Sequence, residues 1–213
     1  MPHQGRDREH ARPGGIAREA DALLRLARKS PVRARDLAKA GIPRVYLRRL
    51  CDRGMLEQVD RGVYRLADAP VTELHSFAEV AVRVPHATIC LLSALQLHEL
   101  TTEVPHAVWA MIDRHARMPK LSYPKLEVVR ASGRALTHGT ENRKVEGVKV
   151  RVTNPAKTVA DCFRYRQHVG LDVALAALRD YLRAHRGGMN ALVEAARADR
   201  IYTFMRPYLE AIA

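Results

Sequence analysis

Three short helices followed by a tight hairpin, all within residues 16–66, constrain the fold of this chain more than any other feature. Along the first helix the apolar residues recur at steps of three and four, which places them on one face. They are Ile16, Ala20, Leu23, Leu24 and Ala27. A second, short helix is predicted around Asp36–Ala40, and Gly41 supplies the left-handed residue that commonly closes a helix.

A third helix and the hairpin complete this pattern. Pro43 fits the first position of a helix that is predicted to run to Arg53. Beyond it, the β-type runs Met55–Val59 and Val63–Leu66 flank a short turn whose glycine permits a positive φ. The order helix, helix, helix, hairpin is typical of a winged helix-turn-helix.

The charge of the chain favours a polyanionic partner. The 213 residues include 36 Lys and Arg against 23 Asp and Glu, which gives a net charge of +13. Residues 1–70 hold 16 basic and 9 acidic residues, so half of the excess lies in the first third of the chain. Neutralising DNA phosphates releases counterions, so this balance indicates double-stranded DNA as the partner. A composition bias that only aids solubility is the alternative.

The predicted DNA contacts are Arg33, Arg35, Arg44, Tyr46, Arg48, Arg49 and Arg61. The third helix carries four of them and is the helix that enters the major groove in this fold. The two near the start of the second helix lie where backbone N–H groups and positive side chains can hold a phosphate. Arg61, at the hairpin tip, is expected to reach the DNA backbone or minor groove. Tyr46 has two interpretations, a hydroxyl contact to phosphate or partial burial against Leu50, and the spacing favours burial.

These features predict an α+β protein with an N-terminal winged helix-turn-helix and a larger mixed α/β domain. We expect a flexible basic arm at 1–15, because this segment has no apolar periodicity, a DNA-binding domain at 16–70 and a C-terminal domain at 71–213. The arm carries Arg6, Arg8 and Arg12, which either enter a minor groove or have no role.

The C-terminal domain is predicted to mix helices and strands. Helices are expected before Pro85, at Thr88–Leu100, from Pro155 through Tyr165, and at about 172–184, 189–196 and 201–211. Strands are expected at Ala107–Ile112, Leu126–Arg130 and Val148–Val152. Asn154 is expected to cap the helix that begins at Pro155. His98, on an apolar helix, is expected to be a hydrogen-bonded core residue.

No catalytic, metal or cofactor site is predicted. Asp113 and Glu127, on neighbouring predicted strands, could together hold a divalent cation, as in a metal-dependent nuclease. The lysine that a restriction-type site needs close after the second acid is missing, so we interpret both carboxylates as solvated or ion-paired. The histidines lack metal-ligand spacing, and neither phosphate-binding glycine loops nor a nucleophile elbow occurs. The three cysteines are odd in number, lie far apart and form no C-x-x-C pair, so they are expected to be reduced.

Several short motifs resemble those of the AbiEi antitoxins, the transcriptional regulators of type IV toxin–antitoxin systems. In the N-terminal half they are Leu47-Arg48-Arg49-Leu50, Gly54-Met55-Leu56 and Arg61-Gly62-Val63-Tyr64. In the second half they are Leu91-Leu92-Ser93-Ala94-Leu95, His98-Glu99-Leu100-Thr101 and Asn154-Pro155-Ala156-Lys157-Thr158 with Ala160-Asp161. The order of these motifs along the chain is more specific than any one of them.

The resemblance implies a winged helix that binds and represses the promoter of its own operon. It also implies a C-terminal antitoxin domain that counteracts a nucleotidyltransferase-type toxin without forming a stable complex with it. For the second-half motifs we favour structural roles over contact with a ligand, with Asp161 paired to a nearby Arg or Lys. A stand-alone regulator without a toxin, its second domain serving dimerisation or effector sensing, is the alternative.

We expect a cytoplasmic location, because the first residues lack the apolar core of a secretory signal and the apolar runs are too short to span a membrane.

Overall fold

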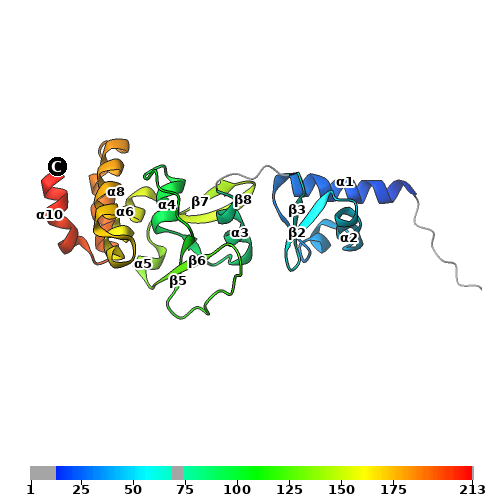
Figure 1. Cartoon of the computed structure of the whole chain (residues 1–213), viewed down its shortest axis with the longest axis horizontal. Coiled ribbons are helices and arrows are strands. Elements are labelled where there is room, and N and C mark those ends of the chain that lie inside the picture. The colour runs from blue at the N-terminus through cyan, green and yellow to red at the C-terminus, as the bar shows by residue number, and fades with distance from the viewer. Residues whose placement is uncertain (1–12, 69–73, 213) are drawn as a thin grey trace, which may run out of the picture. The chain divides into compact units, whose positions relative to one another are not determined.

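The computed structural model describes residues 13–68 and 74–212. The chain divides into two compact units, Met1–Val71 and Thr72–Ala213, and each is described here by itself (Figure 1). The first contains three helical segments and a small antiparallel sheet, and the second is a larger mixture of helices and strands. The α+β fold class predicted from the sequence is therefore confirmed.

The N-terminal unit is a winged helix-turn-helix. Its elements are α1 (Pro13–Lys29), β1 (Val32–Arg33), η1 (Leu37–Ala40), α2 (Val45–Asp52), β2 (Leu56–Asp60) and β3 (Val63–Leu66). The three strands form an antiparallel sheet in the order β1-β3-β2. Leucines from each helical segment and from β2 close the core, namely Leu23, Leu37, Leu47, Leu50 and Leu56.

Three details of this unit differ from the sequence prediction or refine it. α1 begins at Pro13, three residues before the expected start, because proline is well tolerated in the first turn of a helix. The expected arm therefore ends at residue 12, and residues 1–12, including its three arginines, lie outside the described residues. The second helix is a single 3₁₀ segment, closed as expected by Gly41 at φ 67°. Strand β1 was not predicted, because two residues carry no periodicity.

The C-terminal unit is built on a five-stranded mixed sheet. Its strands are β4 (Thr88–Ile89), β5 (Val108–Asp113), β6 (Leu126–Ala131), β7 (Thr140–Val145) and β8 (Val148–Thr153), in the order β6-β5-β4-β8-β7. Its helices are α3 (His75–Arg83), α4 (Leu91–Leu97), α5 (Arg134–Thr137), α6 (Pro155–Arg164), α7 (Arg166–Val169), α8 (Leu171–Ala184), α9 (Met189–Ala198) and α10 (Tyr202–Ile212).

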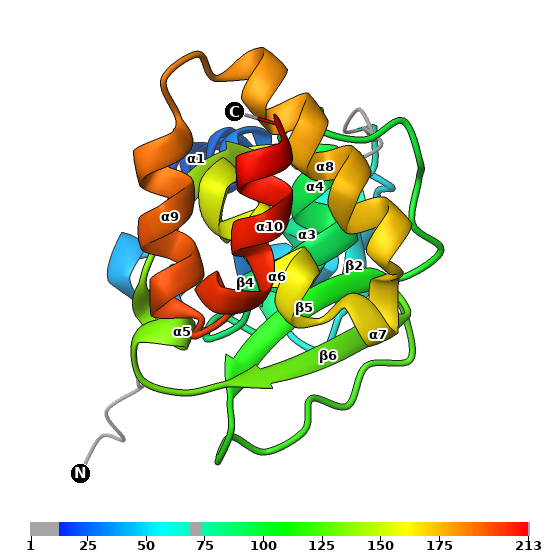
Figure 2. The same cartoon turned by 90° about the vertical axis from the view of Figure 1, so that its left-hand side faces the viewer.

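Alternating side chains of the sheet belong to two different cores. On β5, Trp109 and Met111 pack into the core that also contains α6, α8, α9 and α10. Val108, which directly precedes Trp109 and so points to the opposite face, packs with Phe77 and Val80 of α3 and with the valines of β8. The sheet thus separates α3 from the C-terminal helices, among which α6 is enclosed by α8, α9 and α10 (Figure 2).

The helix predicted at Thr88–Leu100 is wrong in its first residues. Thr88 and Ile89 form the central strand β4, and the helix begins only at Leu91, after Cys90 in an extended conformation. A continuous apolar run does not distinguish a buried strand from a buried helix, which explains the error. None of the helices in the described part of the chain combines the length and apolar character that crossing a bilayer requires.

Candidate nucleic-acid interface

Helix α2 separates apolar from cationic side chains. Tyr46, Leu47 and Leu50 are buried against the rest of the unit. Arg44, at the N-cap position, and Arg48, one turn later, are exposed and lie on one side of the helix because they are four residues apart. Within the described residues, no hydrogen bond or ion pair engages the Arg48 side chain. The helix therefore offers a guanidinium that is free to meet a ligand.

The hairpin forms the wing of the unit. Strands β2 and β3 pair in antiparallel register, and the pairing of Asp60 with Val63 leaves Arg61 and Gly62 at the tip. Gly62 has a φ of 75°, a conformation that glycine adopts without strain. Arg61 is exposed, whereas Arg65 on β3 forms an ion pair with Glu57 across the hairpin. The wing thus presents Arg61 at its tip.

The peptide groups of Ala34 connect the wing with α2. The Ala34 N–H donates a hydrogen bond to the Gly62 carbonyl over 2.8 Å, which extends the pairing of β1 with β3. The Ala34 carbonyl accepts a hydrogen bond from Arg44 Nε over 3.2 Å. Arg33 and Arg35 flank Ala34 in the chain. These bonds join the chain segments that carry four of the predicted contacts, namely Arg33, Arg35, Arg44 and Arg61.

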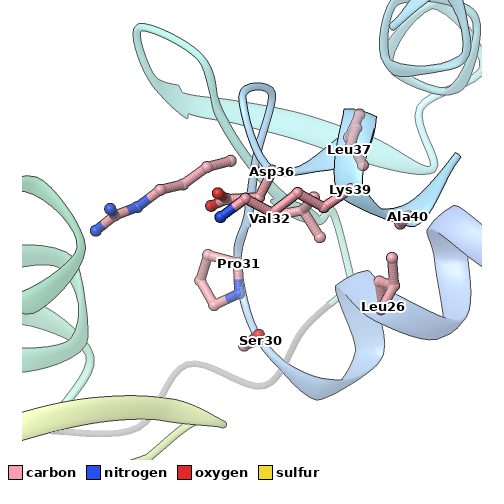
Figure 3. Close-up of a pocket in the computed structure, with 9 residues that line it drawn as sticks. Leu26, Ser30, Pro31, Val32, Asp36, Leu37, Lys39 and Ala40 are labelled. Atoms are coloured by element: carbon pink, nitrogen blue, oxygen red, sulfur yellow. The ribbon is translucent and has the colours of Figure 1, made fainter. Parts of the chain in front are cut away.

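Charge accumulates around Ala34. The pKa of Arg33 is lowered, first by its partial burial and then by the charge of Arg35, while Asp36 acts in the opposite direction. Beside Arg33 lies a hollow of about 400 Å³ whose floor is formed by the buried side chains of Val32 and Leu37 (Figure 3). Figure 3 shows Lys39 and Asp36 side by side at this hollow. An anion bound here in addition to Asp36 would reduce the repulsion between Arg33 and Arg35.

The sequence suggested that Arg33 and Arg35 lie near the start of a helix, and this prediction is wrong. Arg33 lies in β1, Arg35 in the following turn, and η1 begins two residues later. Their positions therefore depend on the pairing of β1 with β3, and a helix N-terminus contributes nothing to the cluster. Ala34 escaped the sequence analysis because it acts through peptide groups, which leave no signal in the residue type.

Tyr46 and Arg49 lie apart from this cluster. Tyr46 is 7% exposed, and its hydroxyl donates a hydrogen bond to Glu19 Oε2 of α1 over 3.0 Å. The guanidinium of Arg49 lies 5.6 Å from the centroid of the Tyr46 ring. The spacing of Tyr46 from Leu50 favoured burial, and the structure gives the tyrosine this role, so its hydroxyl is occupied within the unit.

The two carboxylates considered for a metal site do not converge. In the parallel pairing of β5 with β6, Glu127 is opposite Trp109 and Asp113 is opposite Ala131. The two acids are therefore four residues apart along the strands, or about 13 Å. Asp113 accepts a hydrogen bond from the His115 N–H, and Glu127 forms an ion pair with Lys125. The described residues contain no group of three or more potential metal ligands.

The second-unit motifs have structural roles. The Asn154 side chain caps α6 by accepting a hydrogen bond from the Lys157 N–H over 2.8 Å, as predicted. His98 is hydrogen-bonded through Nε2 to the Thr153 carbonyl over 2.7 Å, as expected, but it is half-buried and not a core residue. Asp161 was expected to pair with a nearby Arg or Lys, and its partner is Lys157, one turn earlier on α6.

Lys157 and Asp161 belong to a buried ionic cluster that the sequence did not indicate in full. Lys157 Nζ also lies 2.9 Å from Oδ1 of Asp199, the residue that ends α9. The side chains of all three are 0% exposed. Two carboxyls and one ammonium give an excess negative charge, and burial together with Asp199 raises the pKa of Asp161 well above its usual value. Burial and the second carboxylate therefore favour the neutral form of Asp161, whereas Lys157 favours the charged form.

Comparison with known families gives the N-terminal unit a place. Residues 21–67, from α1 to the end of the wing, match the family model described as transcriptional regulator, AbiEi antitoxin. This stretch of the N-terminal unit is therefore similar to the regulators of the AbiEi antitoxin family. The match covers the AbiEi-type winged helix and ends before the second unit, whose motifs remain a resemblance. Among curated proteins, nothing matches this chain.

A solved structure supports the fold of the chain as a whole. The chain is similar to the crystal structure of the RV2827C protein from Mycobacterium tuberculosis, with a TM-score of 0.52 and 14% sequence identity. The similarity covers 95% of this chain and 83% of the other. At this identity the likeness concerns the fold alone.

Proposed function

We propose that this chain is a DNA-binding transcriptional regulator that binds the promoter of its own operon and represses it. The proposal is supported by the bonds of Ala34, which join β1, the turn before η1, α2 and the wing, the segments that carry the candidate arginines. A rigid arrangement of cations can match the fixed spacing of phosphates, and a regulator family for the same residues supports this reading.

In this proposal α2 enters the major groove. Arg48 is the first candidate for a base contact, because a guanidinium can form two hydrogen bonds with a guanine edge. Arg44 and Arg49 take the flanking positions on the same helix. Arg33 and Arg35 bind phosphate, and Arg61 reaches the backbone or minor groove from the wing. Tyr46 contributes indirectly, by fixing α2 against α1.

We further propose that the second unit supplies an antitoxin activity against a nucleotidyltransferase-type toxin, without a stable complex between the two proteins. The family of the N-terminal unit and the motifs of the second unit support this. The proposed role needs no cofactor and no catalytic residue, and it acts in the cytoplasm. Co-expression with the product of the adjacent gene tests it: relief of growth arrest is expected, and unchanged arrest alongside intact repression would leave the stand-alone regulator.

Operator binding by three single variants tests the proposed DNA contacts. Arg48→Ala is expected to weaken binding of the upstream region by about 1–3 kcal/mol and to relax sequence preference. Arg61→Ala is expected to weaken binding to all duplexes alike, because it contacts the backbone. Arg183→Ala, which removes an exposed arginine of α8, is the matched control and is expected to change nothing.

The salt dependence of binding gives a second measure. If six arginines neutralise phosphates, log affinity is expected to fall against log salt with a slope of about −5, since each contact contributes about −0.9. Gel shifts or fluorescence anisotropy at several salt concentrations give this slope. A slope near zero, or equal affinity in the Arg48, Arg61 and Arg183 variants, would exclude the proposed interface.

A further inference from the structure

The connection between β5 and β6 is the most unusual surface segment of the second unit. It comprises residues 114–125, which we call the β5–β6 loop, and it joins two parallel strands without a helix. The loop contains Arg114, Arg117, Lys120 and Lys125 and no acidic residue. Figures 1 and 2 show it as a long excursion from the sheet on the side of the edge strand β6.

Both ends of this loop are fastened to the unit. At its start, Arg130 Nη1 donates hydrogen bonds to the carbonyls of Arg114 and Ala116, each over 2.9 Å. At its end, Arg83 of α3 donates a hydrogen bond to the Tyr123 carbonyl. Leu121 packs against the two apolar clusters on the α3 side of the sheet. The loop is therefore held in one shape although it has no regular secondary structure.

The fastened loop turns an aromatic ring and an apolar side chain outward. Tyr123 is 62% exposed and Met118 is 50% exposed, although their neighbours Leu121 and Pro124 are covered. An exposed tyrosine on a fixed backbone offers a flat face to a ligand at a low cost in conformational entropy.

The basic side chains of the β5–β6 loop are also available to a ligand. Among the described residues, Arg117 and Lys120 take part in no ion pair and no hydrogen bond through their side chains. Lys125 is less available, because Glu127 lies 3.5 Å from it. Arg114 is bonded through Nε to the ring of His115 over 2.9 Å. The charge that a ligand can use is therefore concentrated on Arg117 and Lys120.

We propose that the β5–β6 loop binds single-stranded nucleic acid. Arg117 and Lys120 contact successive phosphates, and an unpaired base stacks on Tyr123, with Met118 beside it. Cations interleaved with an exposed aromatic are the features that sequence-tolerant single-strand sites use. A duplex keeps its base faces inside the helix, so it has no group for Tyr123, and an acidic peptide has no planar partner for the ring. The residues of this site belong to the second unit, whereas the candidate arginines of the winged helix belong to the first.

Binding of short labelled oligonucleotides to the full chain tests the site. The probes are oligo(U) and oligo(dT) 12-mers and a mixed-sequence 12-bp duplex, measured by fluorescence anisotropy. Tyr123→Ala is expected to weaken single-strand binding at least fivefold, because stacking on an aromatic contributes substantially per base. Tyr123→Phe retains the ring and is expected to bind like the unchanged protein. Arg183→Ala, which removes an exposed arginine of α8, is the control and is expected to leave single-strand binding unchanged.

Salt titrations separate stacking from phosphate contact. Lys120→Ala and Arg117→Ala are each expected to reduce the slope of log affinity against log salt by about 0.7, the contribution of one phosphate in a single strand. Tyr123→Ala is expected to lower the affinity and leave the slope unchanged. Comparison of oligo(U) with oligo(dT) shows whether RNA or DNA is preferred.

Three results would overturn this proposal. The first is no measurable binding of either single strand. The second is equal affinity for Tyr123→Ala and Tyr123→Phe, which would leave no stacked base. The third is loss of duplex and single-strand binding in the same proportion when Arg117 and Lys120 are replaced, because that would make the loop a general polyanion surface.

Discussion

Removing the ammonium group from the buried cluster of the second unit is expected to destabilise this unit strongly. Lys157→Met keeps the length of the side chain and leaves Asp161 and Asp199 buried without their cation. Deleting one partner of a buried ion pair typically costs about 3–5 kcal/mol. Asp161→Asn is expected to cost about 1 kcal/mol or less, because the raised pKa of Asp161 favours its neutral form and an amide oxygen can still accept from Lys157.

The same cluster predicts a pH dependence. Because the folded-state pKa of Asp161 is raised by burial and by Asp199, its stabilising contribution is complete below the unfolded-state pKa of about 4. As the pH rises from there toward the folded-state pKa, the unfolded chain releases a proton that the folded chain retains. Stability then declines by up to about 1.4 kcal/mol per pH unit relative to Asp161→Asn, which has no proton to lose.

Denaturant unfolding followed by tryptophan fluorescence measures these effects. Trp109 is the single tryptophan of the chain and lies in the second unit, so it reports this unit. The difference in unfolding free energy between the unchanged protein and Asp161→Asn is measured from pH 5 to pH 8. Asp180→Asn, which removes a surface carboxylate near Arg183, is the control. Parallel pH profiles for the protein and Asp161→Asn, or equal losses of unfolding free energy in Asp161→Asn and Lys157→Met, would refute the raised pKa of Asp161.

Three further outcomes are expected. Leu50→Ala should cost about 2–5 kcal/mol of unfolding free energy, because this side chain is only 2% exposed, and should lower DNA affinity only through unfolding, which melting curves separate from binding. Tyr46→Phe should cost about 0.5–1.5 kcal/mol through loss of the bond to Glu19 and leave operator affinity unchanged, which gel shifts would contradict if Tyr46 bound phosphate. Burial raises the pKa of the Cys162 thiol, so a thiol reagent should modify Cys162 only after unfolding, whereas the less buried Cys51 should react first.

The winged helix was predictable from sequence because its elements carry local signals. Apolar spacing defined the helices, Gly41 marked the turn, and the hairpin followed from Gly62 between two β-type runs. The strand β7 was missed for the opposite reason: Thr140–Val145 is an edge strand with mostly polar side chains, so alternation gives no signal. The antiparallel pairing of β7 with β8 defines this strand, and the residue pattern of the segment does not reveal it.

The exposure of several arginines of the candidate interface was predictable from the sequence, whereas their arrangement was not. The positions of the arginines in the helix order indicated exposure, and Arg44, Arg48 and Arg61 are exposed. That Arg49 lies over Tyr46 depends on packing against α1. The buried cluster shows the same limit, since the pairing within α6 follows from the four-residue spacing, whereas Asp199 is brought to Lys157 by the tertiary fold.

The bonds of Ala34 separate the framework of the candidate interface from its readout. On the side of Ala34 both bonds use peptide atoms, so they do not depend on the side chain at position 34. Proline is the exception, because it would remove the N–H that donates to the Gly62 carbonyl. The arginines on either side of Ala34 can therefore be exchanged while the distance between β1 and the wing tip stays fixed. A protein built in this way can acquire a new operator preference through substitutions at the surface, with its scaffold and its stability retained.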